Sequence, residues 1–175
     1  MHTRSYRLTL DAVLTAMALA LSLAERLLPL TLFIPIPGFR IGLSNVITVF
    51  ALCRLSARDS LGILIARCLL AAICGGTVSG LLFSLSGGLL ALLVMVLLSR
   101  CSGLSLIGVC MGGSAAHSTG QILAAMLRFR SMAPLLYLPP LLLLALVTGV
   151  VTGILSLLLV HRIPAKFTEV PTQFK

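Results

Sequence analysis

The chain consists of long apolar runs separated by short polar or basic interruptions. A helix that crosses the hydrocarbon core of a bilayer, roughly 30 Å thick, needs about 20 apolar residues. On this length criterion the pattern predicts six spans, the second of which is short for a full crossing. Their expected ranges are 8–28, 41–55, 59–75, 78–99, 104–127 and 135–160. The runs are too long for a membrane β-barrel, and they lack the alternation of its strands.

The composition also favours a chain embedded in a membrane. Apolar residues make up 59% of the 175 residues and charged residues 10%, against about 45–50% and about 25% in soluble proteins. This excludes a soluble globular enzyme, a disordered chain and a disulfide scaffold. Because irregular backbone cannot face lipid, we expect an all-α polytopic membrane protein, a compact bundle of six transmembrane helices over 8–160. Residues 1–7 and 161–175 are expected to be short cytoplasmic segments.

The distribution of lysine and arginine predicts the orientation, because cytoplasmic loops carry an excess of both. With both termini inside, the cytoplasmic set is Arg4, Arg7, Arg54, Arg58, Arg100, Arg162, Lys166 and Lys175. The external set is Arg26, Arg40, Arg128 and Arg130. The larger internal set favours cytoplasmic termini. No basic patch with interleaved aromatic residues indicates nucleic-acid binding.

The N-terminal region has some features of a secretory signal peptide. Arg4 and Arg7 precede an apolar stretch that leads to the small-residue site Ser22-Leu23-Ala24. The stretch is long for a signal peptide, and its removal would leave five spans. We therefore favour a first membrane span here.

Four spans carry small residues at every fourth position, which places them on one helix face and lets another backbone approach closely. The stripes are Ala12, Ala16, Ala20 and Ala24; Gly76, Gly80, Ser84 and Gly88; Gly108, Gly112, Ala116, Gly120 and Ala124; and Ala145, Gly149 and Gly153. For the last three we expect packing within the bundle. The alanine stripe is uninterrupted and begins at the cytoplasmic end, so it is also a candidate face for docking a helix of another protein.

Arg67 lies inside the third predicted span. An ionisable residue at the centre of a bilayer costs roughly 2.5–3.5 kcal/mol on insertion scales, and it is therefore a functional candidate. Three interpretations stay open. Arg67 forms a structural pair with Glu25, faces a cavity that binds an anionic group, or snorkels to an interface.

His117 and Gln121 are four residues apart in the fifth span and share a helix face. Their donors and acceptors suit ligand recognition, and Asn45, early in the second span, is a further candidate. The alternative is interhelical hydrogen bonding, worth about 0.6 kcal/mol on average in membranes. A single histidine without a second ligand does not indicate a metal site.

Two proline-containing segments interrupt the apolar pattern. Segment 30–40 contains Pro35, Pro37 and Gly38 and ends at Arg40. Because proline restricts the preceding residue to extended conformations, we expect an external loop that either gates the mouth of the bundle or simply connects two spans. The pair 139–140 is expected to kink the sixth span.

Catalytic motifs are missing from the sequence. Neither lysine follows a glycine, so there is no P-loop. The four acidic residues are dispersed, which leaves no cluster to hold Mg²⁺ on a diphosphate. The five cysteines form no CxxC pair, so neither a zinc site nor a disulfide framework is indicated. We expect no enzyme activity, catalytic residue or cofactor, and favour a transporter or a binding subunit.

Three segments together resemble a family of small membrane proteins labelled heptaprenyl diphosphate synthase component I, also called Gx transporter proteins. They are Pro-Gly-Phe-Arg-Ile-Gly-Leu-Ser-Asn at 37–45, Ser-Leu-Ser-Gly-Gly-Leu-Leu at 84–90 and Ala-Ala-His-Ser-Thr-Gly-Gln at 115–121. The resemblance covers about 8–160. That family is similar to the substrate-binding (S) components of energy-coupling factor transporters, six-helix proteins of the bacterial cytoplasmic membrane.

The resemblance implies an S-component-like bundle with a partner. In S components an alanine-rich face of the first helix docks on a transmembrane coupling subunit, which is joined to two ATPases. Here that face would be Ala12, Ala16 and Ala20. The loop with Pro35, Pro37, Gly38 and Arg40 would gate a pocket open to the outside.

Two functions follow as alternatives. The first is an S component for uptake of a small molecule, anionic or related to isoprenoids or quinones. Arg67 would bind its negative group, and His117, Gln121 and Asn45 would orient it. The second is a non-catalytic membrane accessory subunit of heptaprenyl diphosphate synthase, with basic residues such as Arg54 and Arg58 contacting an acidic partner. Nothing resembles the filter or charged ring of a channel.

Overall fold

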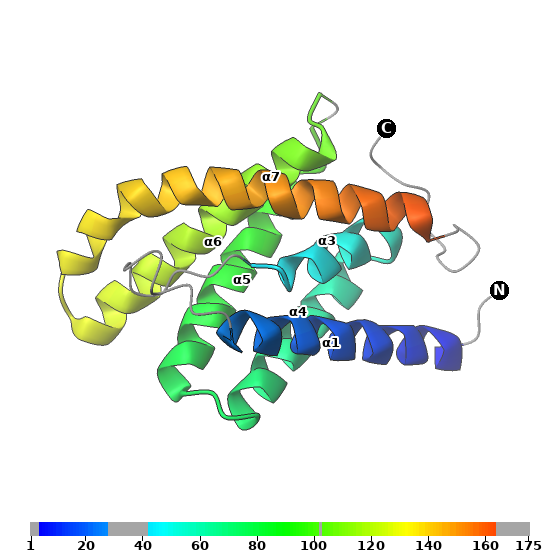
Figure 1. Ribbon diagram of the computed structural model, residues 1–175, viewed down its shortest axis with the longest axis horizontal. Coiled ribbons are helices and arrows are strands. Elements are labelled where there is room, and N and C mark those ends of the chain that lie inside the picture. Colours follow the sequence, from blue (N-terminus) through cyan, green and yellow to red (C-terminus); the bar gives the residue numbers. More distant parts are fainter. Residues whose placement is uncertain (1–3, 28–41, 102, 164–175) are drawn as a thin grey trace.

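The computed structural model describes residues 4–27, 42–101 and 103–163, in which every regular element is a helix (Figure 1). The elements are α1 (Arg4–Leu27), α3 (Asn45–Arg54), α4 (Ala57–Ile73), α5 (Val78–Leu98), α6 (Leu106–Phe129), a 3-10 turn η1 (Ala133–Tyr137) and α7 (Leu138–Arg162). Each of the six expected ranges overlaps one α-helix. The prediction of an all-α fold is thereby confirmed.

Within the described residues, three helical stretches are long and apolar enough to cross a bilayer, namely Ser5–Glu25, Val78–Leu98 and Ala133–Arg162. α3 has ten residues and reaches about 15 Å, half of the hydrocarbon core. α4 has 17 residues, and α6 carries several polar residues near its middle. The chain is a membrane-embedded helical protein, and the count of six crossings stays a prediction.

Local sequence signals determine where several helices begin. The hydroxyl groups at the starts of α4, α5 and α6 each accept a hydrogen bond from the backbone N–H three residues later, as N-caps do. The cap–donor pairs are Ser56–Asp59, Thr77–Gly80 and Ser105–Gly108. Between α4 and α5 the chain turns at Gly75, whose φ of 85° favours a residue without a Cβ atom.

The two prolines of the sixth predicted span do not kink a helix interior, so that expectation is wrong. α7 begins at Leu138 and has Pro139 and Pro140 in its first turn. In the first turn the missing N–H of proline would have had no intrahelical partner, and proline is tolerated there. The pair thus helps to start α7 after the 3-10 turn.

α3 lies at the centre of the bundle (Figure 1). It packs against α1, α4 and α7, and eight of its ten residues are buried. The longer helices pack in sequence, with α1 on α4, α4 on α5, α5 on α6 and α6 on α7. A short helix can occupy the centre because its neighbours, and not lipid, surround it.

Glycines let the backbones of α5, α6 and α7 approach closely. A Cβ atom added to Gly120 would lie 2.7 Å from the carbonyl oxygen of Ser86 on α5. One added to Gly149 of α7 would lie 2.6 Å from Cα of Met111 on α6. A Cβ at Gly153 would lie 2.9 Å from Cα of Ile107. The predicted packing role of these small residues is confirmed.

Polar contacts join several helix ends at one end of the bundle. Arg7 of α1 forms an ion pair with Asp59 of α4 at 3.5 Å. Arg54, at the end of α3, donates hydrogen bonds to the carbonyls of Val160 and Ile163, where α7 ends. The start of α1 and the end of α7 therefore lie at the same end (Figure 1). Arg54 is 7% exposed and is therefore not accessible to a partner, whereas Arg58 is exposed and its contact with a partner stays a prediction.

The close approach of α6 and α7 predicts a marked effect of bulk at Gly149. We expect Gly149→Val to lower the free energy of unfolding in detergent by about 1–3 kcal/mol, because the added atoms overlap the backbone at Met111. Gly62→Val is the matched control, since Gly62 is exposed and a Cβ there meets no atom within 4 Å. Equal stability of the two variants would contradict the close packing.

Candidate ligand-binding site

A buried polar cluster lies inside the bundle where α1, α3, α4, α5 and α6 meet. It surrounds a small cavity lined by Ser22, Glu25, Gly42, Ser44, Asn45, Arg67, Ser84 and His117. Arg67 is 5% exposed, Glu25 7% and His117 8%. Charged and polar groups buried to this degree are costly unless they are paired or hydrogen-bonded. Their convergence from five helices makes this the candidate functional site.

Two charged side chains hold the start of α3. Arg67 of α4 donates a hydrogen bond from Nη1 to the hydroxyl of Ser44, the N-cap residue of α3. Glu25 of α1 accepts a hydrogen bond at Oε1 from the backbone N–H of Leu43 at 2.8 Å. Opposite charges on α4 and α1 thus contact two adjacent residues at the start of α3. Arg67 lines the cavity together with Glu25, while the pair with Glu25 and the binding of an anionic group both stay predictions.

His117 and Gln121 lie one turn apart on the buried face of α6, as their spacing predicts. Both pack on Gly87 of α5, where an added Cβ would lie 3.0 Å from Cε1 of His117 and 2.9 Å from Cγ of Gln121. His117 lines the cavity, whereas Gln121 does not. The glycine therefore leaves room for two polar side chains between α5 and α6.

Two donor atoms of the site have no hydrogen-bond partner among the described residues. They are Nε of Arg67 and Nε2 of Gln121, and both are buried. A buried donor that is left unsatisfied costs about 1–3 kcal/mol, more when it is charged. Such groups are suited to meet acceptor atoms of a ligand.

The cavity is small in this conformation. Its volume of about 10 Å³ is close to the space that one water molecule requires. Pockets for small organic ligands measure about 300–1,000 Å³. A ligand of that size can enter only if the surrounding helices separate.

Comparison with known protein families identifies the family of this chain. The family described as heptaprenyl diphosphate synthase component I matches residues 14–159. The chain belongs to this family. Searches among curated proteins and among solved structures found no match. The family assignment thus confirms the resemblance, and every described residue of the polar cluster falls within the matched range.

In this member of the heptaprenyl diphosphate synthase component I family, the structure brings together Asn45, Arg67 and His117 at one cavity and places Gln121 one turn away. Pro35, Pro37, Gly38 and Arg40 lie outside the described residues. The expected gating loop therefore stays a prediction.

The sequence interpretation missed three serines of the cluster as site residues, Ser22, Ser44 and Ser84. Ser22 precedes Glu25 by three residues, so the two share the buried face of α1. That spacing was a usable signal. Ser44 and Ser84 belong to the segments that carry the family resemblance, but Ser44 has no distinctive spacing, and the spacing of Ser84 within a stripe of small residues indicated packing and not a site.

The alanine stripe of α1 faces away from the bundle. Ala12, Ala16 and Ala20 are exposed, whereas Leu14 and Ala18 are buried. The buried positions are shifted by two residues, about 200° around the helix. The family member thus presents these small side chains, beside the larger exposed Val13 and Met17, on a face of α1 that no described part of the chain covers.

The charges of the cluster predict coupled effects on stability. We expect Arg67→Met to lower the free energy of unfolding by about 3 kcal/mol, because it leaves the Glu25 carboxylate buried without the nearby positive charge. Adding Glu25→Gln should recover part of the loss. Unfolding in detergent measures both variants, with Ser84→Ala as an uncharged control in the same cavity. A double variant as unstable as the sum of the single changes would show that the two charges are independent.

Proposed function

We propose that this protein is the substrate-binding (S) component of an energy-coupling factor type uptake transporter for a small molecule. The observation that carries the proposal is the exposed face of Ala12, Ala16 and Ala20 on α1. A helix that faces only lipid has no need of small side chains, since bulky ones contact acyl chains equally well. Small residues at every fourth position let a second backbone approach closely, which drives helix association in membranes. The proposed partner is the transmembrane coupling subunit, which is joined to two ATPases.

The buried polar cluster supports a binding role for the same protein. Arg67 would bind a negative group of the ligand in place of the Ser44 hydroxyl, with Asn45, His117 and Gln121 setting its orientation. The buried Nε of Arg67 and Nε2 of Gln121 offer donors for this purpose. Glu25 lies in the same cavity, so a ligand with both acceptor and donor groups fits better than a simple anion. No residue of the cluster is assigned a catalytic role or a cofactor.

Topology follows from the same proposal. All six helices would cross or enter a bacterial cytoplasmic membrane, with both termini on the cytoplasmic side. The start of α1 and the end of α7 lie at one end of the bundle, as an even number of crossings requires. The alanine face of α1 would then begin at the cytoplasmic side.

Copurification tests the docking face. Tagged protein is isolated from native membranes in a gentle detergent, and the proteins that accompany it are identified by mass spectrometry. We expect a coupling subunit with two ATPases. Ala16→Leu combined with Ala20→Leu should reduce their recovery about tenfold or more, because bulk at a close helix contact costs about 1–3 kcal/mol.

Gly62→Leu on the exposed side of α4 is the control, since it adds a leucine side chain at a position where an added Cβ meets no atom within 4 Å. The control variant should retain the partner. If the variant with Ala16→Leu and Ala20→Leu recovers as much coupling subunit as the unchanged protein, α1 is not the docking face. A soluble prenyl-diphosphate synthase in place of the coupling module would favour the accessory-subunit function that the family description suggests.

Small molecules extracted from the purified protein test the binding site. We expect Arg67→Gln to lose a compound that the unchanged protein carries, because the charge that holds its negative group is removed. Arg67→Lys keeps the charge and should retain part of it. Mass spectrometry of the extracts, normalised to folded protein, gives the amounts. If Arg67→Gln carries as much of the compound as the unchanged protein, Arg67 does not bind the ligand and has a structural role only.

A further inference from the structure

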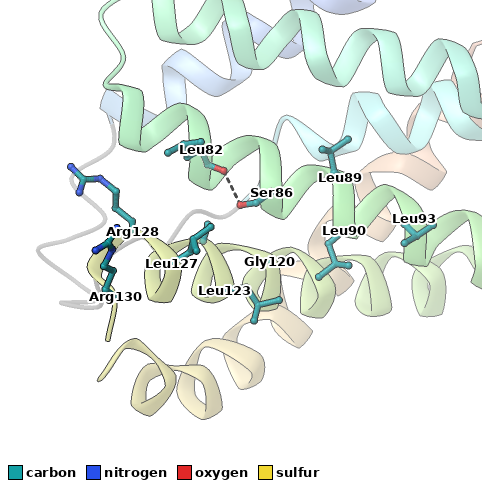
Figure 2. A pocket seen from close by; sticks show the side chains of 11 residues that line it. Leu82, Ser86, Leu89, Leu90, Leu93, Gly120, Leu123, Leu127, Arg128 and Arg130 are labelled. Carbon is teal, nitrogen blue, oxygen red and sulfur yellow. Dashed lines mark hydrogen bonds between the residues drawn. The ribbon is translucent and has the colours of Figure 1, made fainter. Parts of the chain in front are cut away.

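A second, larger hollow lies on the surface between α5 and α6 and shares no lining residue with the cavity of the polar cluster. Figure 2 shows its lining side chains, with α5 on one side and α6 on the other. Its volume is about 810 Å³. Nothing in the proposed transport function uses this groove.

The walls of the groove are apolar. Six leucines line it, Leu82, Leu89, Leu90, Leu93, Leu123 and Leu127. The one hydroxyl on the α5 side, that of Ser86, donates a hydrogen bond to the carbonyl of Leu82 in its own helix at 2.7 Å (Figure 2). It therefore offers no free donor to an occupant. The walls suit a saturated hydrocarbon chain.

The length of the groove corresponds to one leaflet of a bilayer. From Gly120 to Arg130 it follows ten residues, about 15 Å along α6. That is half of the roughly 30 Å hydrocarbon core. A partner transmembrane helix would need a face of about the full thickness, whereas an acyl chain from one leaflet matches the observed length.

Two arginines line the groove at one end. Arg128 lies in the last turn of α6, and Arg130 follows the helix as its cap residue. Both are exposed and lie at the Leu127 end (Figure 2). Arg130 adopts a left-handed conformation with φ of 49°, unusual for a residue with a Cβ atom. Two like charges at one site repel each other, and an anion between them would relieve this repulsion.

We propose that this groove binds an anionic phospholipid of the surrounding membrane, with one acyl chain against the leucines and the phosphate at Arg128 and Arg130. Arginine is well suited to phosphate, because its planar guanidinium offers two parallel donors. The predicted topology places Arg128 and Arg130 in an external loop, where basic residues are less frequent than in cytoplasmic loops. Binding of an anionic lipid gives a reason for their presence there. It does not depend on the transport function.

Tryptophan fluorescence tests the proposal directly, because the chain contains no tryptophan. Leu123→Trp places a single fluorophore in the groove at a position that is 54% exposed. The variant is reconstituted in phosphatidylcholine vesicles that contain increasing amounts of phosphatidylglycerol with brominated acyl chains. The bromine atoms quench the fluorescence of a tryptophan that they contact. Brominated phosphatidylcholine gives the reference. We expect phosphatidylglycerol to bind about fivefold or more tightly, and Arg128→Gln with Arg130→Gln to abolish the preference.

Leu143→Trp on α7, 71% exposed and outside the groove, is the control and should show no preference between the two lipids. Leu127→Trp is a second reporter if Leu123→Trp impairs folding. Equal quenching by both lipids at both groove positions would overturn the proposal, as would a preference that survives loss of the arginines. Displacement of the brominated lipid by a polyprenyl phosphate at a much lower mole fraction would assign the groove to an isoprenoid ligand instead.

Discussion

The position of α3 depends on charged side chains that contact it at both ends. At its start, Arg67 and Glu25 bind the Ser44 hydroxyl and the Leu43 backbone N–H. At its end, Arg54 binds the last carbonyls of α7. A helix of ten residues is too short to be held by lipid at both interfaces. Glu25, Arg67 and Arg54 fix the position of α3 instead. The longer helices pack around α3.

The apolar pattern predicted the helices well because each long run needs to satisfy its backbone hydrogen bonds internally. The range 78–99 and the helix Val78–Leu98 agree almost to the residue. Glycines at every fourth position likewise predicted packing, since Gly120 and Gly149 lie against neighbouring backbones. These features are local or periodic, and a sequence displays them directly.

Other features depend on which elements meet, and the sequence carries no direct signal for that. Arg54 was expected in an exposed loop, but the end of α7 lies beside it and buries it. The outward direction of the alanine stripe followed from the burial of Leu14 and Ala18 on the opposite face, which spacing alone does not reveal. The groove between α5 and α6 depends on how the side chains of these two helices lie against each other, which the sequence of neither helix reveals. The pair at 139–140 was misjudged for a different reason, since the boundary of α7 and not its composition decides whether proline bends it.

Arg54 has a mechanical consequence for the whole bundle. α3 is a single helix about 15 Å long. The polar cavity lies at its start, and the Arg54 contacts to α7 lie at its end. A shift of α3 along its axis that widened the cavity would also change the distance between Arg54 and the carbonyls of Val160 and Ile163. The polar cavity and the end of α7 are thereby linked through a single short helix.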